Sequence, residues 1–373
     1  MKLLSTLLML VFLAVSVVVG HAAEEPVKIA VIAAKTGDGA ATNEVFFQAV
    51  KFVVEELNSG GGLLGRRIEI IEYDNESSSL GSKDAAKKAV AENVLAVVGA
   101  IWSEHSIAVA QVLQEAKIPM ITPQSTNPDV TRVGDYIFRT CYTDAFQGAA
   151  MASFAREDLK AQKAVVLVNI DRKYSEGLAE YFMRSFREKG GTILWKGDFL
   201  IDVSDYSSLL EQARSYQPDV IFLPSDYRDS SHVIGQARKM GITAPFLGGD
   251  AYGVRMYDYI GALVDGNYYT THWHRDEPAS PSQQLVKRYE AKYGEIKQTS
   301  VPLTYDSFML LADAVRRAGS LDRQKIRDAL AETKDFEGIT GKIAFDANRN
   351  PVKSTVVLRF ENGKVVFVKR VQP

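Results

Sequence analysis

The sequence predicts an α/β protein of two lobes, each a doubly wound parallel sheet covered by helices. Short apolar runs rich in β-branched residues alternate with amphipathic helical stretches, which is the order typical of parallel sheets. This alternation runs from residue 27 to residue 140 and restarts from 145 to 270. About 350 residues follow the apolar N-terminal segment, and this length exceeds that of one hydrophobic core. We therefore expect two lobes of similar build.

The N-terminal segment, residues 1–23, has the pattern of a secretory signal peptide. Lys2 precedes an apolar run from Leu3 to Val19, and small residues follow up to Ala23. This pattern predicts export and cleavage near Ala23. The alternative is a membrane anchor, because the run has about the minimum length of a membrane span. No later segment is apolar for long enough to enter a membrane, so we expect a periplasmic, monomeric protein after cleavage.

Composition excludes several classes of function. The net charge is −2 with both signs interspersed, so no basic face predicts binding to nucleic acid. Cys141 is the only cysteine, which excludes an internal disulfide and cysteine-based zinc or iron–sulfur sites. The sequence has no hydrolase elbow, Walker loop or His-Glu-x-x-His motif. We expect a protein that is not an enzyme and has no cofactor and no metal.

The first unit begins with residues 27–34, a short apolar run that predicts a buried strand. In the helix that follows, Phe46, Val50 and Val53 lie on one stripe, and three glycines starting at Gly60 end it. The same alternation then continues along the chain. We expect strands at 27–34, 67–73, 94–100 and 119–122, and helices at 42–57, 84–92 and 103–117.

The second unit follows the same order without a residue-level repeat of the first. Its first helix carries Leu178, Phe182 and Phe186 on one stripe. Near the C-terminus, Asn362-Gly363 separates two alternating runs, which is a strong hairpin signal. We expect strands at 163–169, 192–198, 219–223 and 245–248, helices at 175–189, 206–215, 229–240, 282–293 and 304–318, and hairpin strands at 354–360 and 364–371.

Polar side chains gather in the loops after the predicted strands of the first unit. In open α/β sheets, ligands bind beyond the carboxyl ends of strands, near helix N-termini that attract anions. Trp102-Ser103 follows the third strand, with Ser103 placed as a helix N-cap. Gln124, Ser125 and Thr126 follow the fourth strand. These hydroxyls and amides can bind a carboxylate, and the alternative is ordinary capping and turn chemistry.

The corresponding loops of the second unit contribute a different set of groups. Tyr174 follows the first strand of this unit, and Asp226 follows the third. Asp250 comes after Gly248-Gly249 at the end of a buried strand. A carboxylate in this position can meet an ammonium group, although a turn-forming aspartate is the alternative.

The order and spacing of several motifs resemble those of the leucine/isoleucine/valine-binding proteins of bacterial periplasmic uptake systems. These proteins are type I periplasmic binding proteins, the substrate-binding components of ABC transporters. The similar stretches extend through nearly the whole chain after residue 25. They are Leu63–Ile70, Gly99–Ser103, Ile118–Pro123, Phe138–Thr140, Tyr174–Gly177, Gln236–Gly241 and Leu303–Asp306.

The resemblance implies roles for the residues of the loops. Ser103 and the Ser125-Thr126 pair match the positions that hold the ligand carboxylate in the family. Tyr174 matches the tyrosine that closes over the ligand. Asp250 matches the acidic residue that receives the ammonium group, where glutamate is the usual choice for aliphatic substrates.

Three positions depart from the family pattern. Trp102 and Gln124 are bulkier or more polar than the small residues expected beside an aliphatic ligand. Asp226 falls near the position of an aromatic residue, with Tyr227 adjacent. These departures disfavour leucine, isoleucine or valine as the ligand and leave the amino-acid clamp intact.

The resemblance also implies a hinge of three chain crossings, near Thr143, Thr270 and Thr340. Residues 1–23 are then the signal peptide. The first lobe is 24–142 plus 271–340, and the second is 143–270 plus 341–373. Closure of the hinge over the small-molecule ligand is the expected motion. From the resemblance we also expect the closed protein to deliver its ligand to the membrane permease of an ABC importer.

Three alternatives stay open at this point. The same fold can serve as a sensor for an amide or another small polar solute. An NAD-dependent oxidoreductase is the enzyme alternative, because Gly37-Asp38-Gly39 after the first strand is the context of a dinucleotide loop. In that loop, however, Thr42 replaces the third glycine. The pair His272 and His274 lies on one strand face and suggests a metal site, although an ordinary inter-lobe connection is the simpler role for it and is favoured.

Overall fold

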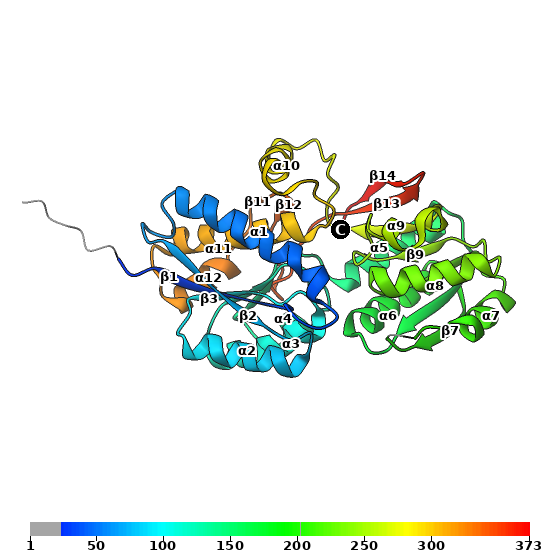
Figure 1. Cartoon of the computed structure of the whole chain (residues 1–373), viewed down its shortest axis with the longest axis horizontal. Coiled ribbons are helices and arrows are strands. Elements are labelled where there is room, and N and C mark those ends of the chain that lie inside the picture. Colours follow the sequence, from blue (N-terminus) through cyan, green and yellow to red (C-terminus); the bar gives the residue numbers. More distant parts are fainter. Residues whose placement is uncertain (1–23, 202) are drawn as a thin grey trace, which may run out of the picture.

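Two α/β lobes lie side by side along the long axis of the molecule (Figure 1). The computed structural model describes residues 24–201 and 203–373. The predicted signal peptide therefore lies outside the described residues. The predicted fold class is confirmed, since each lobe contains its own sheet with helices on both faces.

The first lobe is built on a five-stranded parallel sheet of order β2-β1-β3-β4-β5. Along β1, alternate residues enter two different cores, as the period of a strand requires. Val31 packs with α1 and α11 on one face, and Ile32 packs with α2 and α3 on the other. The elements of this sheet and its helices are β1 (Val27–Ala33), β2 (Ile68–Asp74), β3 (Ala96–Gly99), β4 (Met120–Thr122), β5 (Ile137–Arg139), α1 (Ala40–Ser59), α2 (Ser79–Ala91), α3 (Ser103–Glu115), α4 (Asp129–Arg132), α10 (Ser280–Tyr293), α11 (Ser300–Ala318) and α12 (Arg323–Ala331).

The second lobe contains a seven-stranded sheet of order β14-β13-β10-β9-β8-β6-β7. Five strands are parallel, and the C-terminal hairpin adds β13 and β14 antiparallel at one edge. Helices α5 and α6 cover one face, and α7 and α8 cover the other. The elements are α5 (Asp144–Glu157), β6 (Lys163–Asn169), α6 (Lys173–Glu188), β7 (Thr192–Phe199), α7 (Ser207–Ser215), β8 (Val220–Phe222), α8 (Tyr227–Lys239), β9 (Phe246–Gly248), α9 (Met256–Ile260), β10 (Tyr268–Thr271), β13 (Thr355–Glu361) and β14 (Lys364–Val371).

Helix α5 lies in a stretch for which the sequence predicted no element. Its buried residues include several small ones that are spread around the helix, so the sequence shows no apolar stripe. Gly148 explains the close packing of α5 on α6. A Cβ at this position would lie 2.7 Å from the backbone nitrogen of Phe182. The missing side chain therefore allows the two helices to approach each other.

The chain passes between the two sheets three times, after β5, after β10 and before β13. The third passage differs from the expected position at Thr340. Phe345 packs on Phe138 of the first lobe, with ring centroids 5.5 Å apart. Arg349 donates to the carbonyl of Ile137 at 3.2 Å. Residues 341–351 thus pack on the first lobe, which the sequence missed because this segment carries little apolar patterning.

Buried polar groups connect the first and third passages. Lys353 is buried, and its ammonium donates to the carbonyl of Thr140 at 3.2 Å and to the hydroxyl of Thr340. Burial lowers the pKa of Lys353 to about 8, although the nearby Asp306 acts in the opposite direction. Beside them, the thiol of Cys141 is fully buried and lies 3.3 Å from the carbonyl oxygen of Ser125.

The side chain of Arg139 stabilises the loop after β4 through hydrogen bonds to its backbone. It is fully buried, and its guanidinium donates to the carbonyls of Ser125 at 2.6 Å and Asn127 at 2.8 Å. Both acceptors belong to the loop for which the sequence predicted ligand contacts. The conformation of that loop therefore depends on a side chain from the neighbouring strand β5.

We expect Arg139→Met to lower the free energy of unfolding by about 3 kcal/mol, because two buried carbonyls lose their donors. Urea denaturation followed by circular dichroism measures this change. Arg132→Met is the matched control. Its guanidinium side chain is 64% exposed, so the change should stay within about 0.5 kcal/mol. Equal effects of the two substitutions would contradict the role assigned to Arg139.

Candidate functional site

A cavity of ≈ 550 Å³ lies between the two lobes. The first lobe lines it with Trp102, Ser103 and Gln124, which follow β3 and β4. The second lobe lines it with Tyr174, Asp226 and Asp250, which follow β6, β8 and β9. Six of the eight predicted site residues therefore face one cavity. The two others, Ser125 and Thr126, are not among the residues that line it.

Ser103 is the first residue of α3 and is almost fully buried. The sequence predicted it as the N-cap, but Trp102 occupies that position without a side-chain cap. The Ser103 hydroxyl instead accepts a hydrogen bond from the backbone amide of Asn127 at 3.3 Å. The first amides of a helix have no intrahelical acceptor. The start of α3 thus offers a hydroxyl and a positive dipole end at the cavity wall.

Ser125 and Thr126 are buried in the loop behind the cavity wall. The hydroxyl of Ser125 lies 2.6 Å from the Ser106 hydroxyl and 3.0 Å from the carbonyl of Ile101. The Thr126 hydroxyl lies beside the carboxyl of Asp144, whose pKa burial raises to about 8. The Ser125 hydroxyl is therefore placed to support the loop.

Asp250 is held in place by two other side chains. Its Oδ1 accepts from Gln147 Nε2 at 3.0 Å, and its Oδ2 lies 2.9 Å from His272 Nε2. His272 is buried and stacks on Tyr142 with ring centroids 3.7 Å apart. Burial lowers the pKa of His272, against the raising effect of Asp250. A neutral His272 donates from Nε2 and leaves the carboxylate its full charge and further lone pairs for a ligand.

Tyr174 lies beside the loop that carries Asp250. Its hydroxyl accepts from the backbone amide of Ala251 at 3.4 Å. A Cβ on Gly249 would collide with this hydroxyl, so only glycine admits the tyrosine here. Burial and the charge of Asp250 raise the pKa of Tyr174. The phenol therefore stays protonated and can donate into the cavity.

Asp226 and Gln124 are the two other predicted residues that line the cavity, and they differ in role. Asp226 is the N-cap of α8, where Oδ1 accepts from the backbone amides of Arg228 at 2.8 Å and Asp229 at 3.3 Å. It also lines the cavity. Gln124 is half-buried at the cavity wall. Asp226 thus combines helix capping with exposure to the cavity.

Contacts that cross the cavity were not predicted from the sequence, although Tyr227 was noted beside Asp226. Arg172 donates across the lobes to Asp38 at 2.6 Å and to Glu104 at 3.1 Å. The Tyr227 hydroxyl lies 3.3 Å from the hydroxyl of Thr42 on the first lobe. These residues stand in loops that the sequence singled out, but their partners lie far away in sequence. No local pattern indicates such pairs.

The residues that suggested a dinucleotide loop or a metal site make contacts of a different kind. Asp38 of the glycine-containing loop binds Arg172 of the opposite lobe. His272 pairs with Asp250, and Trp273 packs in a core with α10. Within residues 24–201 and 203–373, no group of three or more His, Cys, Asp or Glu side chains is arranged to hold a metal ion.

A sequence model of the family described as "Periplasmic binding protein" matches residues 26–364. The chain belongs to this family. Its members bind solutes and are not enzymes. In the part of the chain that the structure describes, no helix of this periplasmic binding protein is long and apolar enough to span a membrane.

Similar proteins with solved structures or curated names are also binding proteins of this family. The leucine-binding protein LivK of Thermotoga maritima is 36% identical with a TM-score of 0.89, and the match covers 93% of this chain and 99% of that one. LivJ of Streptococcus pneumoniae, solved with isoleucine, is 30% identical with a TM-score of 0.88, covering 94% and 100%. The leucine-specific-binding protein of Salmonella typhimurium is 24% identical over 79% of this chain and 80% of its own length.

His105, next to the cavity wall, predicts a pH dependence of stability. It is buried beside Trp102, and its Nδ1 lies 3.2 Å from Asn75 Nδ2. Burial lowers the pKa of His105 to about 4. The unfolded chain then binds a proton at higher pH than the folded protein does. Stability from this group is complete above pH ~6.5 and is lost as the pH falls toward ~4.

We expect His105→Gln to remove this loss, which reaches about 3 kcal/mol. Urea denaturation of the wild type and the variant at pH 7 and pH 4.5 measures it, because the other titrating groups cancel in the difference. His232→Gln serves as the control, since this histidine is exposed. An equal difference in free energy of unfolding between the wild type and His105→Gln at both pH values would refute the role of His105.

Proposed function

We propose that this protein is the extracytoplasmic, periplasmic solute-binding component of an ABC importer and that its ligand is an amino acid. One observation carries the proposal. The carboxylate of Asp250 and the N-terminal end of α3 with Ser103 line one cavity from opposite lobes. An amino acid has an ammonium and a carboxylate on adjacent atoms. It can therefore join the two lobes through both of its charged groups.

The electrostatics of the cavity support each half of this contact. The two partners of the Asp250 carboxylate, the amide of Gln147 and a neutral His272, add no positive charge beside it. A ligand ammonium enclosed beside the Asp250 carboxylate would form a strong ion pair that is shielded from water. The start of α3 presents backbone amides and the Ser103 hydroxyl, which favour an anion. The relatives named for leucine and solved with isoleucine support an amino-acid ligand as well.

The ligand side chain extends toward bulky and polar residues. Trp102 and Gln124 line the cavity on the first lobe, and Tyr227 lies opposite. A volume of ≈ 550 Å³ falls in the usual range of small-molecule sites, about 300–1,000 Å³. This volume and these groups favour an amino acid with a long or partly polar side chain over a small aliphatic one.

The proposal includes the domain organisation, the hinge and the partner. Residues 1–23 act as the signal peptide, and the first lobe is 24–142 plus 271–351. The second lobe is 143–270 plus 352–373, since residues 341–351 contact the first. The protein is a monomer that presents its closed form to a membrane permease. Ligand binding favours closure because its contacts come from both lobes.

A thermal-shift screen of residues 24–373 tests the ligand class. The protein is unfolded and refolded to remove captured ligand, then mixed with each common amino acid, amides, urea and small aromatic acids. A ligand present at a concentration of 100 times its dissociation constant stabilises the folded protein by ~2.7 kcal/mol, which raises the melting temperature. We expect a shift with one class of amino acids. Shifts only with amides, or with acids that lack an ammonium group, would contradict the proposal.

We expect Asp250→Asn to weaken binding of that amino acid by ~3–5 kcal/mol, because the ammonium loses its charged partner in a buried place. Isothermal titration calorimetry measures the change. Asp276→Asn is the matched control, because its carboxylate lines the same cavity but is 79% exposed. Wild-type affinity of Asp250→Asn would show that the ammonium binds elsewhere.

We expect Ser103→Ala to weaken the same binding by ~1–3 kcal/mol through the loss of a hydrogen bond to a charged group. The comparison uses the calorimetric titration under identical buffer conditions. Ser125→Ala, which changes a buried hydroxyl behind the wall, separates a direct contact from a change of loop shape. A larger effect at Ser125 than at Ser103 would assign the carboxylate to the loop after β4.

A further inference from the structure

A second group of contacts crosses the cavity between side chains of the two lobes. Arg172 stands at the start of α6, and its side chain is only 14% exposed. Its guanidinium donates to Asp38 Oδ2 at 2.6 Å and to Glu104 Oε1 at 3.1 Å. The same group lies 4.1 Å from the ring centroid of Trp102. One side chain therefore makes two ion pairs and a cation–π contact.

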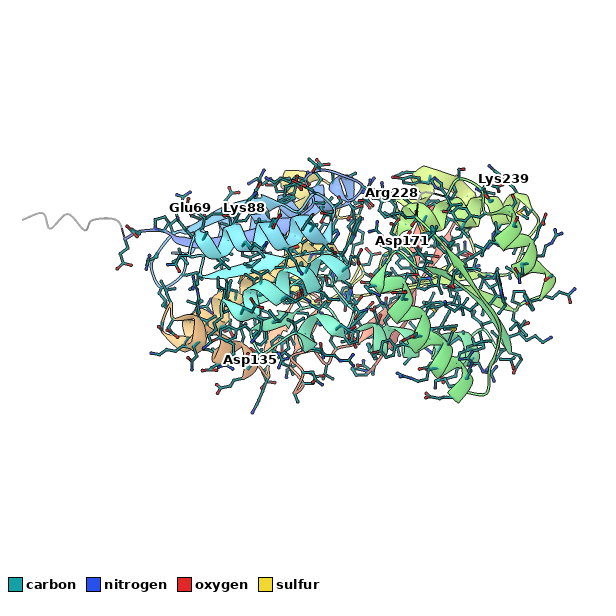
Figure 2. The ribbon with its side chains drawn as sticks, turned by 90° about the horizontal axis from the view of Figure 1, so that it is seen from below. Glu69, Lys88, Asp135, Asp171, Arg228 and Lys239 are labelled. Atoms are coloured by element: carbon teal, nitrogen blue, oxygen red, sulfur yellow. The ribbon has the colours of Figure 1, made fainter. Side chains whose placement is uncertain are left out.

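All three partners of Arg172 belong to the other lobe. Asp38 is in the loop between β1 and α1, and Trp102 and Glu104 are at the start of α3. Figure 2 shows Asp171, the neighbour of Arg172, and Arg228 on the side of the second lobe that faces the first. Arg228 also donates to the backbone carbonyl of Asp38, at 2.5 Å. Separation of the lobes would break every one of these contacts.

The contacts are of a kind that contributes to closure. Hydrogen bonds between ionised groups are about twice as strong as neutral ones, and Arg172 and Glu104 are both mostly shielded from water. Burial by itself lowers the pKa of Arg172, but Glu104 and Asp38 raise it overall. The guanidinium thus stays charged where it is held. An equilibrium between open and closed forms shifts toward the form that makes such contacts.

We propose that Arg172, Asp38, Glu104 and Trp102 form an inter-lobe latch that keeps part of the unliganded protein closed. The latch consists of protein groups alone, so it acts on closure and does not depend on which ligand binds. The apparent affinity of a ligand scales with the fraction of protein in the binding-competent form. The latch therefore raises the affinity for every ligand by one common factor.

Arg172 also lines the cavity, which raises the alternative of a direct ligand contact. In that role it would bind an anionic group of the ligand. A ligand anion would then compete with two carboxylates already within 3.1 Å of the guanidinium. The two roles differ in their consequences, because a direct contact affects only ligands that carry the anion.

Inter-lobe distances in the unliganded protein test the latch. Lys88 and Lys239 are exposed and stand on different lobes (Figure 2), so Lys88→Cys and Lys239→Cys accept spin labels while Cys141 is buried. Pulsed electron paramagnetic resonance then gives the distance distribution after ligand removal by refolding. We expect Arg172→Ala to shift the distribution toward the longer distance. Arg172→Lys should give an intermediate result, because lysine keeps the charge without the planar fork.

Arg187→Ala is the matched control, since this exposed arginine lies on the same helix as Arg172. We expect it to leave the distances unchanged. With Arg172→Ala, the dissociation constants of all bound ligands should rise by a common factor of about tenfold. Asp38→Asn should weaken ligand binding too. The loss of binding free energy in the double variant Arg172→Ala/Asp38→Asn should be smaller than the sum of the losses in the two single variants.

Two results would overturn the latch. The first is an unchanged distance distribution in unliganded Arg172→Ala. The second is a loss of affinity confined to ligands with a carboxylate, which would make Arg172 a ligand contact. The distances require no knowledge of the ligand. The latch can therefore fail while amino acids still bind, and it can hold even where the amino-acid proposal fails.

Discussion

One buried amide, that of Gln147, connects the ligand cavity to the hinge. Its Oε1 accepts from the backbone amide of Asp250 at 2.7 Å and from the hydroxyl of Thr270 at 2.9 Å. Its Nε2 donates to the Asp250 carboxylate. Gln147 lies in the first turn of α5, directly after the first passage between the lobes, and Thr270 lies just before the second. The position of the charged group in the cavity is thereby tied to the geometry of the chain crossings.

The same connection provides hydrogen bonds to the Asp250 carboxylate, which is shielded from water. A carboxylate removed from water needs hydrogen bonds in exchange. The amide of Gln147 and the imidazole of His272 supply them without adding a charge. A ligand ammonium then meets a carboxylate that is already fixed in orientation. Little further ordering of this side chain accompanies binding, and ordering of side chains is a major cost of association.

Periodicity and strand order predicted most of the fold, and β6 begins and ends where the sequence placed it. The cavity could be predicted because loops after parallel strands meet at one edge of a sheet. The orientation of Ser125 could not, since Arg139 on another strand holds the carbonyls of that loop. The contact of Arg172 with Asp38 joins residues 134 positions apart. Local sequence contains no information on such a pair.

The position of Cys141 has a chemical consequence for a protein that works outside the cytoplasm. Thiolates are the form that oxidants and disulfides attack, and burial raises the pKa of this thiol to about 12. The folded protein therefore resists sulfenic acid formation and mixed disulfides in an oxidising compartment. The unfolded chain has no such protection. Cross-linking between chains is therefore a hazard only until β5 and the first passage have packed around the thiol.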